Sequence, residues 1–367
     1  MPARSDSVYL DYNATTPLCN AARASISDAL EALGNASSVH SFGRSVRARI
    51  EDARDKVAKL SEVDSQAVTF TSGATEANAL VIGGLQSSGT AKSVLCSAIE
   101  HPSVLENVAP DKIVRVTNEG VVDLDHLDAS LREHAAPALV CIMAANNETG
   151  VVQPIEQAKE IITAHGGYLF CDMVQTPGKI PVQEFSRNAD VYSVSAHKFG
   201  GPAGIGALVN PRGLEIAPSF HGGGQERKVR SGTENFLGIV GFGAAAQNVA
   251  NLGIDESIRQ RRDSLEQRLL ASCPEAVIFG RSQARLPNTI CVATPQVTSQ
   301  QQLIKLDLAG FAVSAGSACS SGKIAKSHVL VAMGVSDLLA GTAIRISIGR
   351  ETTQEELERF ADTWSKL

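Results

Sequence analysis

The chain has 367 residues, of which 33 are basic and 39 acidic, so its formal net charge is −6. Hydrophobic residues make up 43% and charged residues 20%, which is the composition of an ordinary globular protein and excludes a disordered or fibrous chain. The mild acidity and the lack of a Lys/Arg block argue against direct nucleic-acid binding as the main task.

The sequence shows no recognisable membrane-spanning segment, signal peptide or metal-binding motif. No apolar run approaches the roughly 20 residues of a membrane-spanning helix, and residues 1–8 lack the apolar core of a signal peptide. Seven cysteines without paired spacing fit a reducing compartment better than a disulfide framework. We therefore expect a cytoplasmic protein with no membrane association and no metal site.

In chain order, an extended stretch at 8–13 precedes two helices, at about 20–33 and 44–60, and short apolar strands then alternate with helices. The expected strands are 67–70, 93–97, 112–116, 139–143, 168–171 and 191–195. The expected helices between them are 76–85, one starting near 102, 124–134 and 154–165. This alternation predicts a mostly parallel sheet covered by helices on both faces. Three cysteines inside these strands are interpreted as buried hydrophobes: Cys96, Cys141 and Cys171.

The last third of the chain predicts a second unit. A long helix is expected at 244–258, although Gly253 weakens its second half. Strands at 276–279, 289–292 and 344–348 and helices at 300–309 and 354–366 follow. This pattern indicates a smaller α+β domain.

Lys198 follows the expected strand at 191–195 and precedes a glycine-rich turn. A lysine just past a strand end lies where α/β proteins keep their chemistry, and its amine can act covalently. Ser195 and His197 offer polar contacts for an anion, and the glycines let backbone approach a ligand. This combination suits a lysine that holds pyridoxal phosphate as a Schiff base. The alternative is a surface lysine in a turn, and these residues by themselves do not decide between the two.

Three further stretches lie at the same expected sheet edge. Asp172 leaves the strand 168–171 where it can accept the N–H of a pyridine ring, although an aspartate there is also a common turn cap. Residues 71–76 join a strand to a helix whose first amides, with the Thr75 hydroxyl, would hold a phosphate. His101 follows the next strand and can stack on a ring or move protons, although a histidine before a proline more often starts a helix.

Together these stretches resemble the NifS-like cysteine desulfurases, fold type I pyridoxal-phosphate enzymes related to the class V aminotransferases. The matching stretches, in family order over nearly the whole chain, are 9–16, 70–77, 100–102, 146–150, 172–179, 195–206, 222–235, 316–321 and 345–350. The resemblance implies a large α/β domain at 14–250 with a mostly parallel seven-stranded sheet. It also implies a small α+β domain, formed by 1–13 and 251–367, with a mobile loop at about 314–326.

The resemblance implies cofactor contacts for individual residues. Lys198 would bind pyridoxal phosphate covalently, Asp172 would bind the pyridine nitrogen and His101 would stack on the ring. Gln175 would contact the ring hydroxyl or the substrate. The residues implied at the phosphate are Ala74, Thr75, Ser195, His197 and, from the neighbouring subunit of a homodimer, Thr233.

The resemblance also implies how substrate is held. Asn147 would contact the substrate or the ring hydroxyl, and Arg345 would clamp the substrate carboxylate, a task that its planar fork suits. Cys319, in a loop rich in glycine and serine, would be the nucleophile that forms a persulfide. On composition alone, a single cysteine in such a loop is a weak candidate, and the surrounding match is what supports it.

The implied activity is removal of sulfur from L-cysteine, which gives L-alanine and a Cys319 persulfide. A protein acceptor, such as an iron–sulfur scaffold or a thiolation protein, would take the sulfur. One alternative is another class V enzyme, such as a selenocysteine/cysteine lyase or a small amino-acid aminotransferase. The other is a sulfur-relay partner without turnover, against which the set of Lys198, Asp172, His101 and Arg345 counts.

Two departures from the family pattern concern the acceptor. Lys323 and Lys326 stand after the cysteine loop where relatives commonly carry an acidic residue followed by proline, and well-known relatives continue into a longer C-terminal tail. We expect the two lysines to favour an acidic face on the acceptor. The acceptor itself is not indicated by the sequence.

Overall fold

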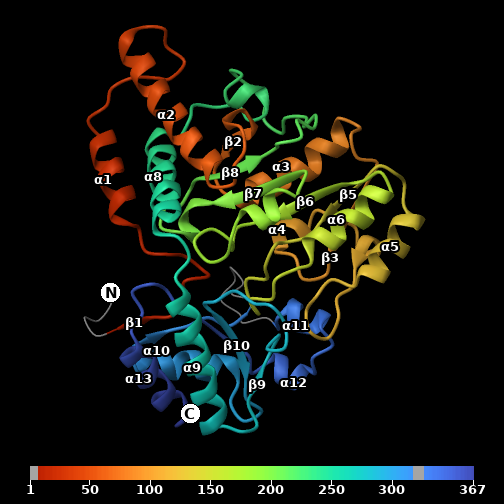
Figure 1. Cartoon of the computed structure of the whole chain (residues 1–367), viewed down its shortest axis with the longest axis vertical. Helices are drawn as coiled ribbons and strands as arrows, with labels where there is room; N and C mark the ends of the chain where they lie inside the picture. The colour runs from red at the N-terminus through yellow and green to blue at the C-terminus, as the bar shows by residue number, and fades with distance from the viewer. Residues whose placement is uncertain (1–6, 317–325) are drawn as a thin grey trace.

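The computed structural model describes residues 7–316 and 326–367, and Figure 1 shows a larger sheet-bearing unit above a smaller one. The larger unit contains a seven-stranded sheet with the order β2-β8-β7-β6-β5-β3-β4. Only β8 runs antiparallel to its neighbours, β2 and β7, so the predicted mostly parallel seven-stranded sheet is confirmed. The strands are β2 (Val68–Thr71), β3 (Ser93–Ser97), β4 (Ile113–Val114), β5 (Ala138–Cys141), β6 (Tyr168–Asp172), β7 (Val191–Ser195) and β8 (Gly206–Val209).

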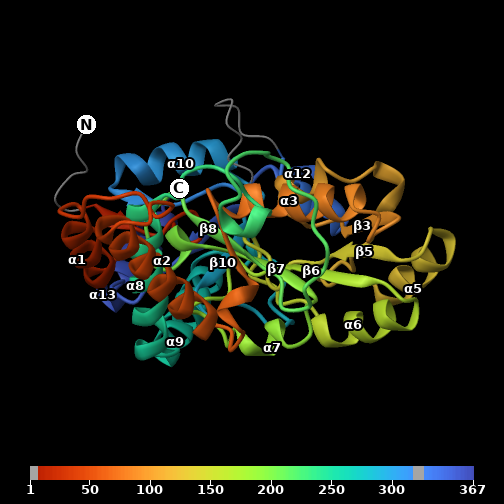
Figure 2. The ribbon, with the colours of Figure 1, turned by 90° about the horizontal axis from the view of Figure 1, so that it is seen from above.

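Helices cover both faces of this sheet, as Figure 2 shows from above. On one face, α3 (Ala74–Ser87) and α4 (Pro102–Leu105) bury a cluster that includes Cys96, Cys141 and Phe170. The next residue, Cys171, belongs to the cluster on the other face, because successive strand residues point to opposite sides. The helices of that second face are α2 (Ser41–Lys59), α5 (Leu124–Glu133), α6 (Ile155–Ala164), α7 (Gln183–Ser186) and α8 (Phe236–Leu252).

The three strand cysteines are fully buried, which confirms their interpretation as small core residues. Since burial deprives a thiolate of solvation, it raises the pKa of the Cys141 and Cys171 thiols well above the ordinary value. These sulfurs are therefore unsuited to a nucleophilic role.

The smaller unit contains two short sheets. One is antiparallel, in the order β12-β10-β9, and the other pairs the N-terminal β1 with β11 in parallel. Its strands are β1 (Val8–Tyr9), β9 (Val277–Ile278), β10 (Thr289–Ala293), β11 (Phe311–Ala312) and β12 (Ile344–Ser347). Its helices are α9 (Glu256–Ser272), α10 (Ser299–Leu308), α11 (His328–Ala332), α12 (Asp337–Ala340) and α13 (Gln354–Trp364). Val8 and Leu10 pack in one core with β10, β12, α9 and α13, so the start of the chain joins residues from its end.

The predicted single helix at 244–258 is wrong. Helix α8 ends at Leu252 because Gly253 adopts a φ of 63°, and α9 starts at Glu256 after Asp255 caps it. The two helices meet at 82°. In the part of the chain that the structure describes, no single helix has the length and apolarity needed to cross a membrane, and only this bent pair meets that test when its two helices are counted together.

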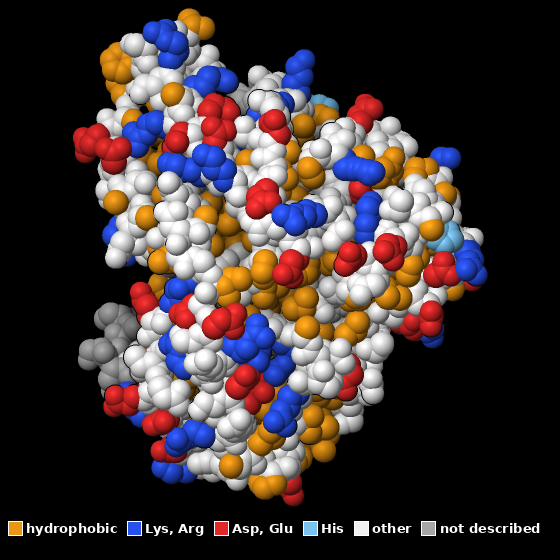
Figure 3. Space-filling model, viewed as in Figure 1, with side chains coloured by type: hydrophobic (Ala, Val, Ile, Leu, Met, Phe, Trp, Pro, Cys, Tyr) orange, Lys and Arg blue, Asp and Glu red, His pale blue; other side chains and the backbone are white. Residues whose placement is uncertain are grey.

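The surface in Figure 3 carries acidic and basic side chains interspersed over both units. Helix α1 (Asn20–Ala29) and the start of α2 project from the larger unit (Figure 1). Apolar side chains gather at the tip of this projection, where Val39 is 87% and Leu33 76% exposed. The described part of the chain also contains four one-turn 3-10 helices: η1 (Ser65–Ala67), η2 (Pro110–Lys112), η3 (Ala196–Lys198) and η4 (Glu226–Lys228).

Candidate active site

A cavity of about 600 Å³ lies between the two units, at the edge where the carboxyl ends of β2, β3, β6 and β7 meet. The smaller unit contributes Ser314, Gly316, His328 and Arg345 to its wall. The predicted residues that line it are Ala74, Thr75, His101, Asn147, Asp172, Gln175, Ser195, His197, Lys198 and Arg345. These predicted residues, which lie up to 271 positions apart in the chain (positions 74 and 345), are therefore brought to one site.

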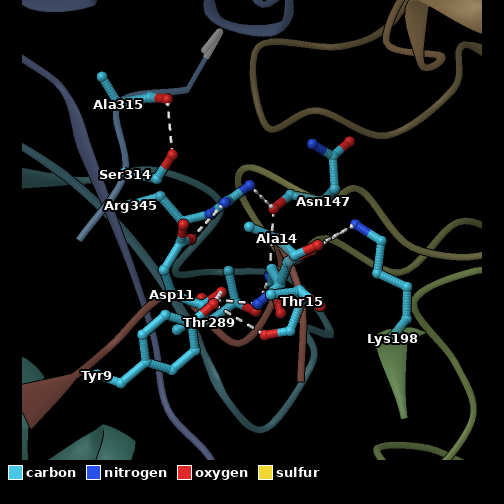
Figure 4. Close-up of polar contacts among 12 residues, drawn as sticks. Tyr9, Asp11, Ala14, Thr15, Asn147, Lys198, Thr289, Ser314, Ala315 and Arg345 are labelled. Atoms are coloured by element: carbon cyan, nitrogen blue, oxygen red, sulfur yellow. Dashed lines mark hydrogen bonds and ion pairs between the residues drawn. The ribbon is translucent and has the colours of Figure 1, made fainter. Parts of the chain in front are cut away.

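Lys198 ends the short η3 turn directly after β7. Its Nζ donates to the carbonyls of Asn13 at 2.8 Å and Ala14 at 2.9 Å, as Figure 4 shows for Ala14. Burial lowers the pKa of Lys198 to about 8, and the Arg345 charge contributes to this, whereas Asp172 and Asp11 raise the pKa. The neutral, nucleophilic amine is therefore a minority form near neutral pH, but far more abundant than in a lysine of ordinary pKa.

The turn that presents Lys198 is held by close backbone contacts. Thr16 Oγ1 donates to the Lys198 carbonyl at 2.7 Å, and Thr16 N donates to the His197 carbonyl at 2.8 Å. Gly200 has a φ of 91°, a conformation that favours glycine. Gly200 thus serves the geometry of this turn, while the predicted approach of backbone to a ligand stays a prediction.

Asp172 lies at the end of β6, and its carboxylate is held from two sides. Oδ1 accepts from Val174 N and Oδ2 accepts from Asn78 Nδ2, both at 3.0 Å. Asn78 is fully buried on α3, and its own Oδ1 accepts from Ser193 Oγ at 2.7 Å. Asn78 therefore fixes the aspartate that faces the cavity, a role that nothing in the sequence pattern predicted.

The start of α3 provides anion donors. Gly73 is its N-cap and offers no side chain to the first-turn amides, so those of Ala74 and Thr75 remain at the cavity wall. Gly206 packs against the Gly73 backbone, where an added Cβ would lie 2.8 Å from Gly73 Cα.

His197 lies on the wall of the same cavity. Burial, together with the Lys198 charge, lowers the pKa of His197 to about 4, so the imidazole is neutral near pH 7. This donor set fits the phosphate of pyridoxal phosphate.

His101 caps the short helix α4 and faces the cavity. Its Nδ1 accepts from Ser103 N at 3.1 Å, so the proton of the neutral ring lies on Nε2. Desolvation by the surrounding protein lowers the pKa of His101; Asp172 opposes this effect and Lys198 adds to it. The ring is therefore available as a neutral donor or as a flat contact surface.

Gln175 and Asn147 are tied to the same N-terminal residue, Asn13. Gln175 Nε2 donates to the Asn13 carbonyl at 3.0 Å, and Asn13 Nδ2 donates to the Asn147 carbonyl at 3.1 Å. Lys179 Nζ donates to Gln175 Oε1 at 2.5 Å and to Asn13 Oδ1 at 3.2 Å. Burial lowers the pKa of Lys179 well below the ordinary value, with Lys198 and Arg345 contributing. The stretch 9–16 matched the family, but neither Asn13 nor Lys179 received a role from the sequence.

Arg345 projects from β12 and is only 5% exposed. Its Nη2 donates to Asp11 Oδ1 at 2.6 Å and its Nη1 to the Asn147 carbonyl at 3.1 Å (Figure 4). Its Nε has no hydrogen-bond partner among the described residues. A buried cation with donor capacity to spare, at a cavity wall, is suited to a carboxylate.

Cys319 and Lys323 lie outside the described residues, so their predicted roles stay predictions. The chain on either side meets at one buried carboxyl: Ser327 Oγ donates to Glu148 Oε2 at 2.5 Å, and a Cβ on Gly316 would lie 2.1 Å from that oxygen. Lys326 forms an ion pair with Asp337 at 2.6 Å. Within the described ranges, no cysteine lines the cavity.

Thr233 is the predicted site residue that the structure places elsewhere. It lines a separate pocket of about 170 Å³ with Glu226 and Arg230, outside the cavity of its own chain. Three successive residues before it, 226–228, have positive φ, and Glu226 Oε2 accepts from Arg54 Nη1 at 2.7 Å in a buried ion pair. The strained turn is therefore anchored to the body of the larger unit.

A sheet-edge lysine, an aspartate for a ring nitrogen and a helix N-terminus for a phosphate define, on this fold, a fold type I pyridoxal-phosphate enzyme. The chain belongs to the class-V aminotransferase family, whose model matches residues 8–360. The cofactor of this enzyme family is pyridoxal phosphate.

Relatives with cysteine desulfurase names match nearly the whole chain. Cysteine desulfurase IscS of Dictyoglomus turgidum is 40% identical over 98% of this chain and 94% of its own length. Cysteine desulfurase of Cereibacter sphaeroides is also 40% identical, over 97% of this chain and 94% of its own length. The solved structure of a NifS-like protein from Rickettsia africae superposes with a TM-score of 0.89 at 35% identity, covering 98% of this chain and 99% of that one.

Proposed function

We propose that this protein is a cysteine desulfurase, which converts L-cysteine to L-alanine and carries the sulfur as a persulfide on Cys319. The observation that carries the proposal is the 40% identity, over almost the full chain, to enzymes named cysteine desulfurase. The cavity supports it, because Lys198, Asp172, His101 and Arg345 all line its wall.

The cofactor would be held by residues whose chemistry matches each of its parts. Lys198 would bind it covalently, Asp172 would accept the ring N–H, and His101 and Gln175 would contact the ring and its hydroxyl. The phosphate would lie against Ala74, Thr75, Ser195 and His197. When bound, pyridoxal phosphate supplies a ring that withdraws electrons from the α-carbon of an amino acid.

The chain's own residues orient the substrate and move its proton. Arg345, with Asn147 beside it, would hold the α-carboxylate of cysteine. The amine of Lys198, which the substrate amine would replace at the cofactor, is the group that would carry the α-proton. Since both groups lie on the same cavity, binding and proton transfer occur at one place.

Cys319 would take the sulfur. Its thiolate attacks the substrate sulfur, an S–S bond forms and the substrate C–S bond breaks. The pair of electrons from that bond stays with the carbon skeleton, which takes up a proton and leaves as alanine. The enzyme persulfide is then ready for transfer to a protein acceptor, such as an iron–sulfur scaffold or a thiolation protein.

We also propose a cytoplasmic homodimer in which Thr233 completes the partner's phosphate site. The position of Thr233 outside its own cavity supports a contact in trans. The division into a large domain at 14–250 and a small domain at 1–13 and 251–367 is part of the same proposal.

Cysteine variants test the function. Cys319→Ala should bind pyridoxal phosphate and show cysteine-dependent changes in its visible spectrum, yet release almost no alanine, because the other predicted residues remain. Cys319→Ser should fare no better, since a hydroxyl is a far poorer nucleophile toward sulfur. Cys273→Ala, which changes a half-buried cysteine away from the cavity, serves as the control and should match the parent. Full alanine release by Cys319→Ala would instead indicate a lyase that needs no loop cysteine.

A further inference from the structure

Arg345 already holds a carboxylate. Asp11 Oδ1 lies 2.6 Å from Arg345 Nη2, and both residues line the cavity. Figure 4 shows the two side chains pointing toward each other beside Asn147, whose backbone carbonyl accepts from Nη1. The Arg345 guanidinium, which we propose binds the substrate carboxylate, is thus already paired with a carboxylate of its own chain, that of Asp11.

Asp11 is the only acidic residue in the described ranges that forms an ion pair with this guanidinium. A buried charge without a partner is strongly destabilising, so removal of Asp11 leaves Arg345 poorly compensated. The Asn147 carbonyl is a neutral acceptor and cannot replace it. Asp11 therefore stabilises Arg345 while the cavity holds no substrate.

The backbone of Asp11 is fixed, but its side chain is not enclosed. Tyr12 N donates to the Ser347 carbonyl at 3.1 Å and Ser347 N donates to the Leu10 carbonyl at 2.8 Å, which ties residues 10–12 to β12. The Asp11 side chain retains 20% of its exposure, whereas that of Arg345 retains 6%. Of the two partners, the carboxylate is therefore the more accessible from the cavity, while its backbone is held by β12.

We propose that Asp11 is a placeholder for the substrate carboxylate, which the incoming amino acid displaces from Arg345. The proposal rests on the assignment of Arg345 in the proposed function. Two carboxylates at one guanidinium repel each other, so the free enzyme's ion pair lowers the affinity for every ligand with an α-carboxylate. Asp11 is in this sense a residue that sets substrate affinity, acting through Arg345.

The test uses Asp11→Asn in the protein loaded with pyridoxal phosphate, with L-alanine as the probe because it carries the carboxylate and no sulfur. The dissociation constant for L-alanine, from spectral titration, should fall about tenfold, as expected when a competing charge is removed. The melting temperature without ligand should fall, and saturating L-alanine should raise it more than in the parent. L-Alaninamide, which lacks the carboxylate, should show no gain in affinity.

Three controls separate the possible failures. Asp28→Asn breaks the exposed pair with Arg49 and should leave L-alanine binding unchanged. Arg345→Ala should weaken L-alanine binding, and Asp11→Asn added to Arg345→Ala should bring no gain. Should Asp11→Asn fold poorly, Asp11→Ser gives the same comparison.

The outcomes are distinguishable. Parent-like L-alanine binding by Arg345→Ala would overturn the substrate role of Arg345 and, with it, this inference. Weak binding by Arg345→Ala together with unchanged or weaker binding by Asp11→Asn would overturn the placeholder alone. In that case the pair only positions the arginine.

Discussion

At the scale of single residues, Lys198 gives a pH-dependent prediction. Because burial and Arg345 lower its pKa to about 8, the rate at which cofactor-free protein captures pyridoxal phosphate should rise through about pH 8 and level off above it. Arg345→Ala removes a lowering influence, so its midpoint should move to higher pH. Stopped-flow absorbance measures both rates. A parent midpoint near the ordinary pKa of lysine, about 10.4, would contradict the account.

The same lowered pKa affects the stability of the cofactor-free protein. Between about pH 8 and the ordinary lysine value, the unfolded chain binds more protons at Lys198 than the folded chain does. The contribution of this lysine to the free energy of unfolding is therefore complete above the unfolded pKa and is lost as the pH falls through about 8. Urea unfolding of the parent should show this slope, and Lys198→Met should lack it.

Residue patterns, together with the family resemblance, predicted most of the residues that line the cavity, but not the contacts that hold them. Lys198, Asp172 and His101 could be found because each follows an apolar strand. Asn78 and Asn13 act through hydrogen bonds to residues 94 and 134 positions away, Asp172 and Asn147, and no local pattern signals such pairings. Asp11 was likewise unassigned, since its partner Arg345 lies 334 positions away.

At the scale of elements, the approach of β8 to the start of α3 supports the phosphate site. An added Cβ on Gly206 would lie 2.8 Å from both Gly73 Cα and the Val194 carbonyl oxygen. Gly206→Ala should therefore push the residue 73 loop outward, weaken pyridoxal-phosphate binding and destabilise the protein by about 1–3 kcal/mol, as overpacking does. Equilibrium dialysis and urea unfolding measure the two effects.

The control for Gly206→Ala is Gly83→Ala, because a Cβ on Gly83 of α3 would meet nothing within 4 Å. That variant should retain the cofactor affinity of the parent and match or exceed its stability, since alanine favours helix. Unchanged cofactor affinity in Gly206→Ala would show that this close approach does not position the phosphate donors.

There are physical reasons why sequence patterns missed some elements. Strand β8 is only four residues long, Gly206–Val209, and follows a glycine-rich turn, so it resembled loop. Its place between β2 and β7 is a matter of tertiary pairing. The predicted helix at 244–258 joined parts of α8 and α9 because the apolar residues Leu252, Ile254 and Ile258 continue past residue 250, whereas the conformation of Gly253 separates the two helices. Conversely, β3 and β7 were predicted with their observed bounds, because each is a short apolar run bounded by polar residues.

At the scale of the whole molecule, Thr233 outside its own cavity predicts complementation between two inactive variants. Lys198→Ala and Thr233→Ala subunits, when mixed, should form hybrids in which one site has the lysine of one chain and the threonine of the other. Activity should then exceed that of either variant, because this one site per hybrid dimer is intact. Size-exclusion chromatography with light scattering would confirm the dimer.

The same hybrids would show whether the assignment of Thr233 to the partner's site is wrong. If Thr233 acts within its own chain, each site in a hybrid lacks one residue and mixing brings no recovery. A monomeric parent with full activity would contradict the shared site as well. Mixing Lys198→Ala with a Lys198→Arg subunit, which should recover nothing, controls for stabilisation by mixing itself.

The central claim is that sulfur from L-cysteine is carried on Cys319, and mass spectrometry after a single turnover tests it most directly. The parent should gain one sulfur atom, about 32 Da, on the peptide that contains Cys319, in step with alanine release. The buried Cys96, Cys141 and Cys171 should remain unmodified because their thiols are enclosed. Sulfur on another cysteine, or alanine release at the parent rate with Cys319 unmodified, would contradict the account.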